Sequence, residues 1–167
     1  MNDATKWIEH LKLEHHPEGG WYHEVYRSDE TIEVQALPGR YNLAHCFSTS
    51  IYFLLDTKDF SAFHRISSDE TWHFYLGSPV IIYILFPEGN ILTIVLGNCL
   101  AEGQVLQYTI PRNCWFAAQN QDVNEFSLLG CTVSPGFEFQ DFELGRRQSL
   151  LELFPIHEKI INLLTRS

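Results

Sequence analysis

Between residues 21 and 135 the chain alternates short apolar runs with turn-forming residues. The runs are six to twelve residues long and rich in β-branched and aromatic side chains, which favour strands. They cover residues 21–28, 44–55, 61–66, 71–77, 79–86, 91–97, 104–110, 114–119 and 125–135. About nine short strands without intervening helices predict an all-β sandwich or barrel.

Turn and helix signals complete this outline. The tetrapeptide PEGN at residues 87–90 predicts a hairpin between the runs on either side of it. An apolar face that begins at Trp7 predicts a short helix, which ends before Pro17. A second helix is predicted over residues 155–164, because Pro155 suits a first helical position and apolar residues follow at helical spacing.

Length and charge limit the classes of function. A chain of 167 residues fits a single domain, residues 1–167, and 45% hydrophobic residues are enough for a buried core. The formal net charge of -10 repels phosphate backbones and anionic membranes, so neither nucleic acid nor a membrane is expected as a partner. A local basic pocket for an anionic small molecule stays open.

The cysteines and the N-terminus predict the compartment. Four cysteines occur without a CxxC pair, and we expect buried free thiols in a reducing cytoplasm. Disulfides or a reactive thiol are the alternatives. No apolar h-region follows Met1, and no apolar run approaches the ~20 residues of a membrane helix. A cytoplasmic protein is therefore expected.

The stretch FHRISSDETWHFYLG gathers polar residues that are typical of functional sites. In a strand, residues of equal parity share a face. His64 then shares a face with Ile66, and Glu70 shares one with Trp72 and Phe74. Placing Trp72 and Phe74 in the core puts Glu70 inside as well. A single β-bulge would reverse this assignment.

The spacing His64-x-Ile66-x3-Glu70-x6-Gly77 resembles the first cupin motif, and residues 103–116 resemble a degraded second motif. The segments HPEGGWYHEVYRS, FHRISSDETWHFYLG, IPRNCWFAA and LLGCTVSPGFEFQDFELG are similar to small RmlC-like cupins of unknown function, cupin family 5. The resemblance covers about residues 7–145. It implies a jelly-roll cupin barrel with short N- and C-terminal helices. It also implies a homodimer, with an N-terminal segment packing across the interface.

The resemblance also bears on metal binding. Better-known cupins hold a transition metal with two His and one Glu of the first motif and a His of the second. This chain keeps His64 and Glu70 but has Ile66 and Phe116 at the other two positions. Two ligands rarely hold such a metal, so no metal cofactor is expected. A divalent metal held atypically through His64 and Glu70 stays open. Asn113 replaces the glycine of the second motif, but asparagine tolerates a left-handed turn.

The two motifs together suggest a mostly apolar cavity with a few polar groups, as in a small-molecule site. Its predicted lining is Ile66, Trp72, Phe74, Phe116, His64 and Glu70. A His-carboxylate pair in a dry cavity can carry out general acid–base catalysis, with His64 as base and Glu70 orienting it or exchanging protons. The structural alternative is a buried histidine that only satisfies the core.

The strand at residues 21–28 offers further ligand contacts. Tyr22 and Glu24 have one parity and Arg27 the other, and either set could face the cavity. Arg27 is a candidate anion clamp, because guanidinium binds carboxylate or phosphate with two prongs. A surface ion pair is the alternative.

Two other polar clusters are expected to have no catalytic role. His10, His15 and His16 fall at a helix end and a turn, where solvated histidines are common. In the run GFEFQDFELG at residues 136–145, we expect the phenylalanines to pack along a closing segment and the acidic residues to be solvated.

These expectations lead to a small-molecule-binding cupin. Sugar-nucleotide epimerases share the RmlC-like barrel and use a barrel histidine as base, so the resemblance implies a carbohydrate or sugar-nucleotide-like ligand and epimerase or isomerase chemistry. One alternative is a non-catalytic binding or sensing module with the same cavity. Another is a metal-dependent cupin enzyme with an atypical ligand set.

Overall fold

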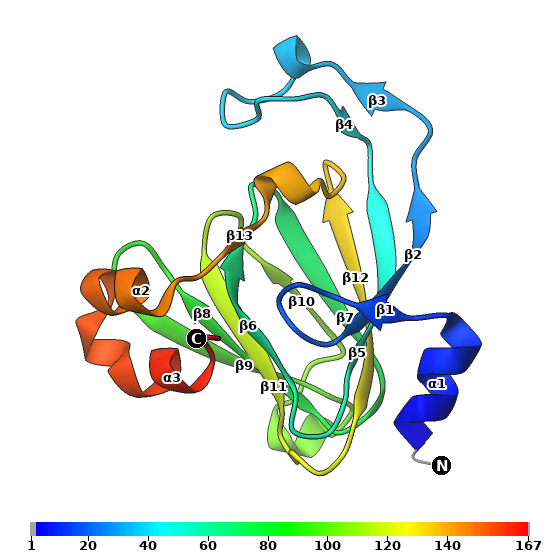
Figure 1. The fold of residues 1–167 in the computed structure, drawn as a ribbon, viewed down its shortest axis with the longest axis vertical. Helices are drawn as coiled ribbons and strands as arrows, with labels where there is room; N and C mark the ends of the chain where they lie inside the picture. Colours follow the sequence, from blue (N-terminus) through cyan, green and yellow to red (C-terminus); the bar gives the residue numbers. More distant parts are fainter. Residues whose placement is uncertain (1–2, 167) are drawn as a thin grey trace.

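The computed structural model describes residues 3–166 and consists mainly of two antiparallel sheets (Figure 1). The six-stranded sheet has the order β1-β2-β5-β12-β7-β10, and the five-stranded sheet has the order β13-β6-β11-β8-β9. A two-stranded ribbon, β3 with β4, extends beyond the sheets. The expected all-β fold is confirmed.

The six-stranded sheet comprises β1 (Glu14–His15), β2 (Trp21–Arg27), β5 (Thr49–Leu55), β7 (Asp69–Gly77), β10 (Gln107–Ile110) and β12 (Ser127–Ser134). The five-stranded sheet comprises β6 (Phe60–Arg65), β8 (Val80–Leu85), β9 (Ile91–Leu96), β11 (Trp115–Asn120) and β13 (Glu143–Leu144). The ribbon consists of β3 (Thr31–Ile32) and β4 (His45–Cys46). The helices are α1 (Asp3–Leu11), α2 (Arg147–Leu153) and α3 (Glu158–Leu163), and the short 3-10 turns are η1 (Val34–Ala36), η2 (Leu100–Glu102), η3 (Phe139–Asp141) and η4 (Pro155–His157).

Local sequence signals predicted the strands and their turns well. Each predicted apolar run contains a strand, and the run at residues 44–55 divides into β4 and β5. The PEGN hairpin joins β8 to β9, with the Phe86 N–H donating to the Asn90 carbonyl at 3.0 Å. Asn113 has a φ of +61°, which confirms the left-handed turn expected there.

Strand β7 alternates as its sequence predicts. Glu70, Trp72 and Phe74 are buried on the inner face, and His73 points outward to hydrogen-bond Thr132 at 3.1 Å. The strand ends at Gly77, which has a φ of +99°. A Cβ there would lie 2.2 Å from the Phe126 carbonyl oxygen, so only glycine fits. The tight end fixes β7 against β12.

The core between the sheets is separate from the packing on their outer faces. Phe53, Trp72 and Phe116 belong to the core between the two sheets. A second cluster, around Leu150 and Ile161, packs α2 and α3 against the outer face of the five-stranded sheet (Figure 1). A third cluster packs α1 against the six-stranded sheet. The helices therefore pack on the outer faces of the sheets and leave the inner faces to the core between them.

The C-terminal helix differs from the prediction of one helix over 155–164. The structure has α2 first, then a 3-10 turn from Pro155 to His157, and then α3. Proline lacks a backbone N–H, so it starts a new turn and cannot continue α2.

Within the described residues, no helix is both long and apolar enough to cross a membrane.

Candidate functional site

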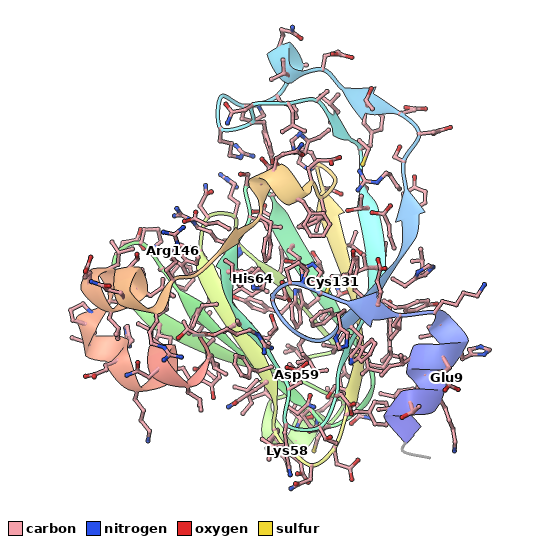
Figure 2. All side chains as sticks on the ribbon, viewed as in Figure 1. Glu9, Lys58, Asp59, His64, Cys131 and Arg146 are labelled. Carbon is pink, nitrogen blue, oxygen red and sulfur yellow. The ribbon has the colours of Figure 1, made fainter. Side chains whose placement is uncertain are left out.

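A cavity of about 320 Å³ lies between the two sheets. The loop from β1 to β2 crosses in front of the sheets (Figure 1), and the closing segment, residues 136–145, covers the cavity from another side. Figure 2 labels His64 on β6 and Cys131 on β12, which line the cavity from the two facing sheets. The lining residues are Glu14, His16, Glu18, Tyr22, His23, Glu24, Arg27, Thr49, Ile51, Phe53, His64, Ile66, Glu70, Trp72, Cys131, Val133, Phe137, Phe139 and Phe142.

His64 is held rigidly in the wall of this cavity. Its Nδ1 lies 2.8 Å from the Ala62 carbonyl oxygen, which can only accept, so Nδ1 carries the proton. Its ring packs on Phe116, with the ring centroids 4.0 Å apart. Nε2 therefore points its lone pair at the Glu18 carboxyl, whose Oε2 lies 3.1 Å away. Burial lowers the pKa of His64 from 6.5 to about 3, so this imidazole is neutral.

Glu18 is the partner of His64, and it comes from the loop between β1 and β2. The loop is tied to β6, because the Ala62 N–H donates to the Glu18 carbonyl at 2.9 Å. The Ser61 hydroxyl donates to the carboxyl at 2.7 Å. Burial, and next the nearby Glu70 carboxyl, raise the pKa of Glu18 well above 4.5. A protonated Glu18 can donate to the neutral His64 Nε2, which satisfies both groups.

His16 lies on the other side of the same carboxyl. Its Nδ1 accepts the Glu18 backbone N–H at 3.3 Å and lies 3.4 Å from the Glu18 Oε2. Burial lowers the pKa of His16 to about 4. The expectation of a solvated histidine was wrong, since the side chain is only 7% exposed and packs against Tyr22 and Phe142. The Glu18 carboxyl thus lies between two neutral imidazoles.

Glu70 is a second buried carboxyl of the cavity, in a different environment. Burial raises its pKa from 4.5 to about 7, although the Cys131 thiol and the Trp72 indole face it and lower the pKa in part. The indole makes no hydrogen bond of normal geometry. Among the described residues, Trp72 Nε1 is the one buried side-chain nitrogen or oxygen without a hydrogen-bond partner. The cavity thus holds an unused donor beside a carboxyl that is half ionised near neutral pH.

Arg27 reaches the cavity because β2 has a bulge. The pairing register of β2 with β5 shifts between Glu24 and Tyr26, so the side chains of Tyr22, Glu24 and Arg27 all line the cavity despite their different parity. The Arg27 guanidinium donates to Glu24 at 3.0 Å and to Glu138 at 2.7 Å. These carboxylates raise its pKa, Glu24 most. Arg27 is therefore already occupied as an ion-pair partner.

The closing segment is tied down more firmly than its sequence suggests. Its phenylalanines line the cavity, as the expected packing required. Its acidic residues are ion-paired: Glu143 is exposed, as expected, whereas Asp141 is largely buried, which corrects the expectation that it is solvated. Glu138 pairs with Arg27, Asp141 with the fully buried His45, and Glu143 with Arg65. These pairs connect the segment to β2, β4 and β6.

The structure brings most of the predicted site residues together. His64, Ile66, Glu70, Trp72, Tyr22, Glu24 and Arg27 line the cavity. Phe74 and Phe116 do not, because both are packed into the core between the sheets, where their rings are covered by other side chains. Sequence reasoning missed Glu18, His16 and Cys131. For Glu18 the signal was a carboxyl beside Gly19 and Gly20, which indicated only a turn.

Comparisons with known proteins place this geometry in a family. A family model described as cupin superfamily (DUF985) matches residues 5–145. The chain belongs to the cupin superfamily.

This cupin is similar to proteins from distant organisms. Protein SO0799 of Shewanella oneidensis is 40% identical, with a TM-score of 0.89 and 99% of each chain covered. A hypothetical protein of Leishmania major is 32% identical, with a TM-score of 0.87, covering 99% of this chain and 100% of that one. The uncharacterized protein YML079W of Saccharomyces cerevisiae is 27% identical over 80% of this chain and 71% of its own length. Oxalate decarboxylase of Bacillus subtilis is 13% identical, with a TM-score of 0.55 over 90% of this chain and 36% of that chain. This last likeness concerns the fold alone.

The residues of this cupin do not fit the metal centre that the cupin motifs imply. His64 directs Nε2 at the Glu18 carboxyl, and Glu70 faces a thiol and an indole. Ile66 and Phe116 stand at the other two ligand positions. Among residues 3–166, no group of three or more His, Cys, Asp or Glu side chains is arranged to hold a metal ion.

Proposed function

We propose that this cupin binds a small polar organic molecule in its barrel and moves a proton on it, as isomerases and epimerases do. The observation that carries the proposal is the pair of buried carboxyl groups, Glu18 and Glu70, which line one cavity in unlike environments. Buried titratable groups with perturbed pKa values in one cavity are typical of acid–base catalytic sites.

Glu18 supplies the acid in this proposal. Its carboxyl lies between two neutral imidazoles, and the His64 Nε2 can accept a hydrogen bond from it without taking the proton. His64 acts as a positioning residue, because its Nδ1 is fixed on the Ala62 carbonyl and its Nε2 orients the carboxyl. This role differs from the base expected from sequence, since a pKa of about 3 makes His64 a weak base.

Glu70 supplies the base. With a pKa of about 7 it is half ionised near neutral pH, where a general base works best. Its carboxylate takes a proton from the carbon next to a carbonyl, and the electron pair moves onto the carbonyl oxygen. That oxygen takes the Glu18 proton, which gives an enediol. Glu70 then gives its proton to the former carbonyl carbon, and the hydroxyl on the neighbouring carbon loses its own proton to Glu18 and becomes the new carbonyl, which completes an aldose–ketose isomerisation.

The size and walls of the cavity favour a single-ring ligand. A volume of about 320 Å³ lies at the low end of small-molecule sites, which span about 300–1,000 Å³. A monosaccharide fits this space better than a whole sugar nucleotide, whose nucleotide would extend into solvent. The aromatic walls, including Trp72 and Phe142, suit the apolar faces of a sugar ring.

The test is solvent exchange on candidate substrates. The protein is incubated in D2O with D-glucose, D-fructose and D-glucosamine, and loss of the proton next to the carbonyl carbon is followed by NMR. We expect exchange with at least one sugar, and its loss in Glu18→Gln and Glu70→Gln. Glu143→Gln is the matched control, because that carboxylate pairs with Arg65 outside the cavity and should leave exchange unchanged.

Two outcomes would replace this proposal. Sugar binding without exchange would favour the non-catalytic binding or sensing module. Neither binding nor exchange would exclude these sugars as the ligand class and refute the proposal in this form.

The proposal includes a homodimer in the cytoplasm. The four free thiols at Cys46, Cys99, Cys114 and Cys131 support a reducing compartment. Size-exclusion chromatography coupled to light scattering gives the mass of the assembly, and twice the chain mass of 19.4 kDa is expected.

A further inference from the structure

The charge inside the cavity is one-sided. Four carboxyl groups line it, those of Glu14, Glu18, Glu24 and Glu70, against one guanidinium, that of Arg27. No lysine from the described part of the chain lines the cavity. The guanidinium already donates hydrogen bonds to Glu24, to Glu138 and, at 3.0 Å, to the Phe137 carbonyl. An anionic ligand would have to displace these partners, whereas a cationic one would find the Glu70 carboxyl without a counter-charge.

Among the described residues, the two buried carboxyls have no cationic side chain beside them. A buried carboxylate needs an opposite charge, or it takes up a proton. Neither the Glu18 nor the Glu70 carboxyl has an Arg or Lys within ion-pair distance among the pairs that the described residues form. Arg166 donates to the Glu18 backbone carbonyl at 3.1 Å, to Asp59 and to the Phe60 carbonyl, and not to the Glu18 carboxyl. A ligand cation would take the place of the missing counter-charge.

The surrounding rings suit the same kind of ligand. Phe137, Phe139 and Phe142 gather around His16 and line the cavity, with ring centroids 5.0 to 6.4 Å from one another. Aromatic faces attract organic ammonium ions, and desolvated sites strengthen this attraction. Rings and carboxyl groups in one cavity therefore favour a cation over a neutral ligand of the same shape.

A second observation favours a ligand that also carries an acceptor. The Trp72 indole is 1% exposed and lines the cavity, and its Nε1 has no hydrogen-bond partner. A buried N–H donor left unpaired costs free energy, which a hydroxyl or carbonyl oxygen of the ligand would recover. Because the indole lies beside the Glu70 carboxyl, the oxygen and the cation are close together in the ligand.

We propose that the natural ligand is an organic ammonium compound of monosaccharide size with a hydroxyl or carbonyl oxygen next to its amine. The ammonium group lies among the carboxyl groups and the phenylalanine rings, and the oxygen accepts from the Trp72 N–H. The inference rests on the proposed function only in using the same cavity. It narrows the substrate class from sugars in general to amino sugars and similar amino alcohols.

The test compares three sugars that differ mainly in charge. D-glucosamine, D-glucose and D-glucose 6-phosphate are titrated into the protein by calorimetry near pH 7. We expect D-glucosamine to bind about tenfold tighter than D-glucose, since a hydrogen bond to a charged group is stronger than one to a neutral group. D-glucose 6-phosphate should bind weakest. In Glu70→Gln the preference for D-glucosamine should largely vanish, and in Trp72→Phe both sugars should weaken together.

The experiment separates this proposal from the proposed catalysis. A preference for D-glucosamine without proton exchange in D2O would support the ligand class and refute the chemistry. Equal binding of D-glucosamine and D-glucose, or tightest binding of D-glucose 6-phosphate, would overturn the ligand class. So would the absence of binding by all three sugars at about 10 mM, a concentration that detects millimolar affinity. Glu143→Gln serves as the control and should bind all three sugars as the natural protein does.

Discussion

Replacing Glu70 by glutamine tests the central electrostatic claim about the cavity. Glutamine keeps the shape of the side chain but cannot ionise. Burial raises the pKa of Glu70 from 4.5 to about 7. Below pH 4.5 the carboxyl is protonated in the folded and the unfolded chain, so it costs nothing there. As pH rises to about 7 the unfolded chain loses this proton first, and the folded state becomes relatively less stable.

The size of the effect follows from the shift. Each pKa unit corresponds to about 1.4 kcal/mol, so the natural protein loses about 3 kcal/mol of unfolding free energy through Glu70 between pH 4.5 and 7. Glu70→Gln lacks this loss. The variant should therefore match the natural protein near pH 4.5 and exceed it by about 3 kcal/mol above pH 7.

Urea unfolding followed by tryptophan fluorescence, repeated across this pH range, measures the difference. Other titrating groups are common to both proteins and largely cancel in it, and Glu143→Gln controls for the loss of an exposed carboxylate. A difference that does not change with pH would mean that Glu70 ionises as freely as a solvated carboxyl. The assignment of Glu70 as a base near neutral pH would then be refuted.

Three further predictions follow from other contacts. Because the pKa of His64 is lowered to about 3, the unfolded chain takes up a proton below pH 6.5 that the folded state resists, and the natural protein loses stability on acidification. His64→Gln lacks this group and should lose less stability, which the same unfolding assay measures. Metal content by plasma mass spectrometry should be well below one per chain and unchanged in His64→Ala and Glu70→Ala; about one metal per chain, lost in both variants, would contradict the donor arrangement. Arg27→Ala removes the pair with Glu138, so amide exchange of residues 136–145 should quicken by mass spectrometry, and unchanged exchange would show that other contacts hold the segment.

The sequence determined much of the fold because its strongest signals are local. β-branched runs and turn residues located the strands, and Asn113 marked a left-handed turn. Alternation along β7 correctly placed Glu70 and Trp72 inside, because side-chain direction in a regular strand depends only on parity. The cupin motif residues His64 and Gly77 also fell where their spacing indicated.

Only the tertiary structure decided which groups meet in the cavity. The bulge in β2 broke the parity rule and brought Arg27 in beside Glu24. The loop that carries His16 and Glu18 has the polar, turn-forming sequence of an exposed segment, but its backbone is tied to β6 and buries both side chains against His64. Contacts between segments so distant in sequence depend on how the sheets close, and burial then sets the protonation of these groups. That is why the acid of the proposed mechanism could be recognised only once the chain was folded.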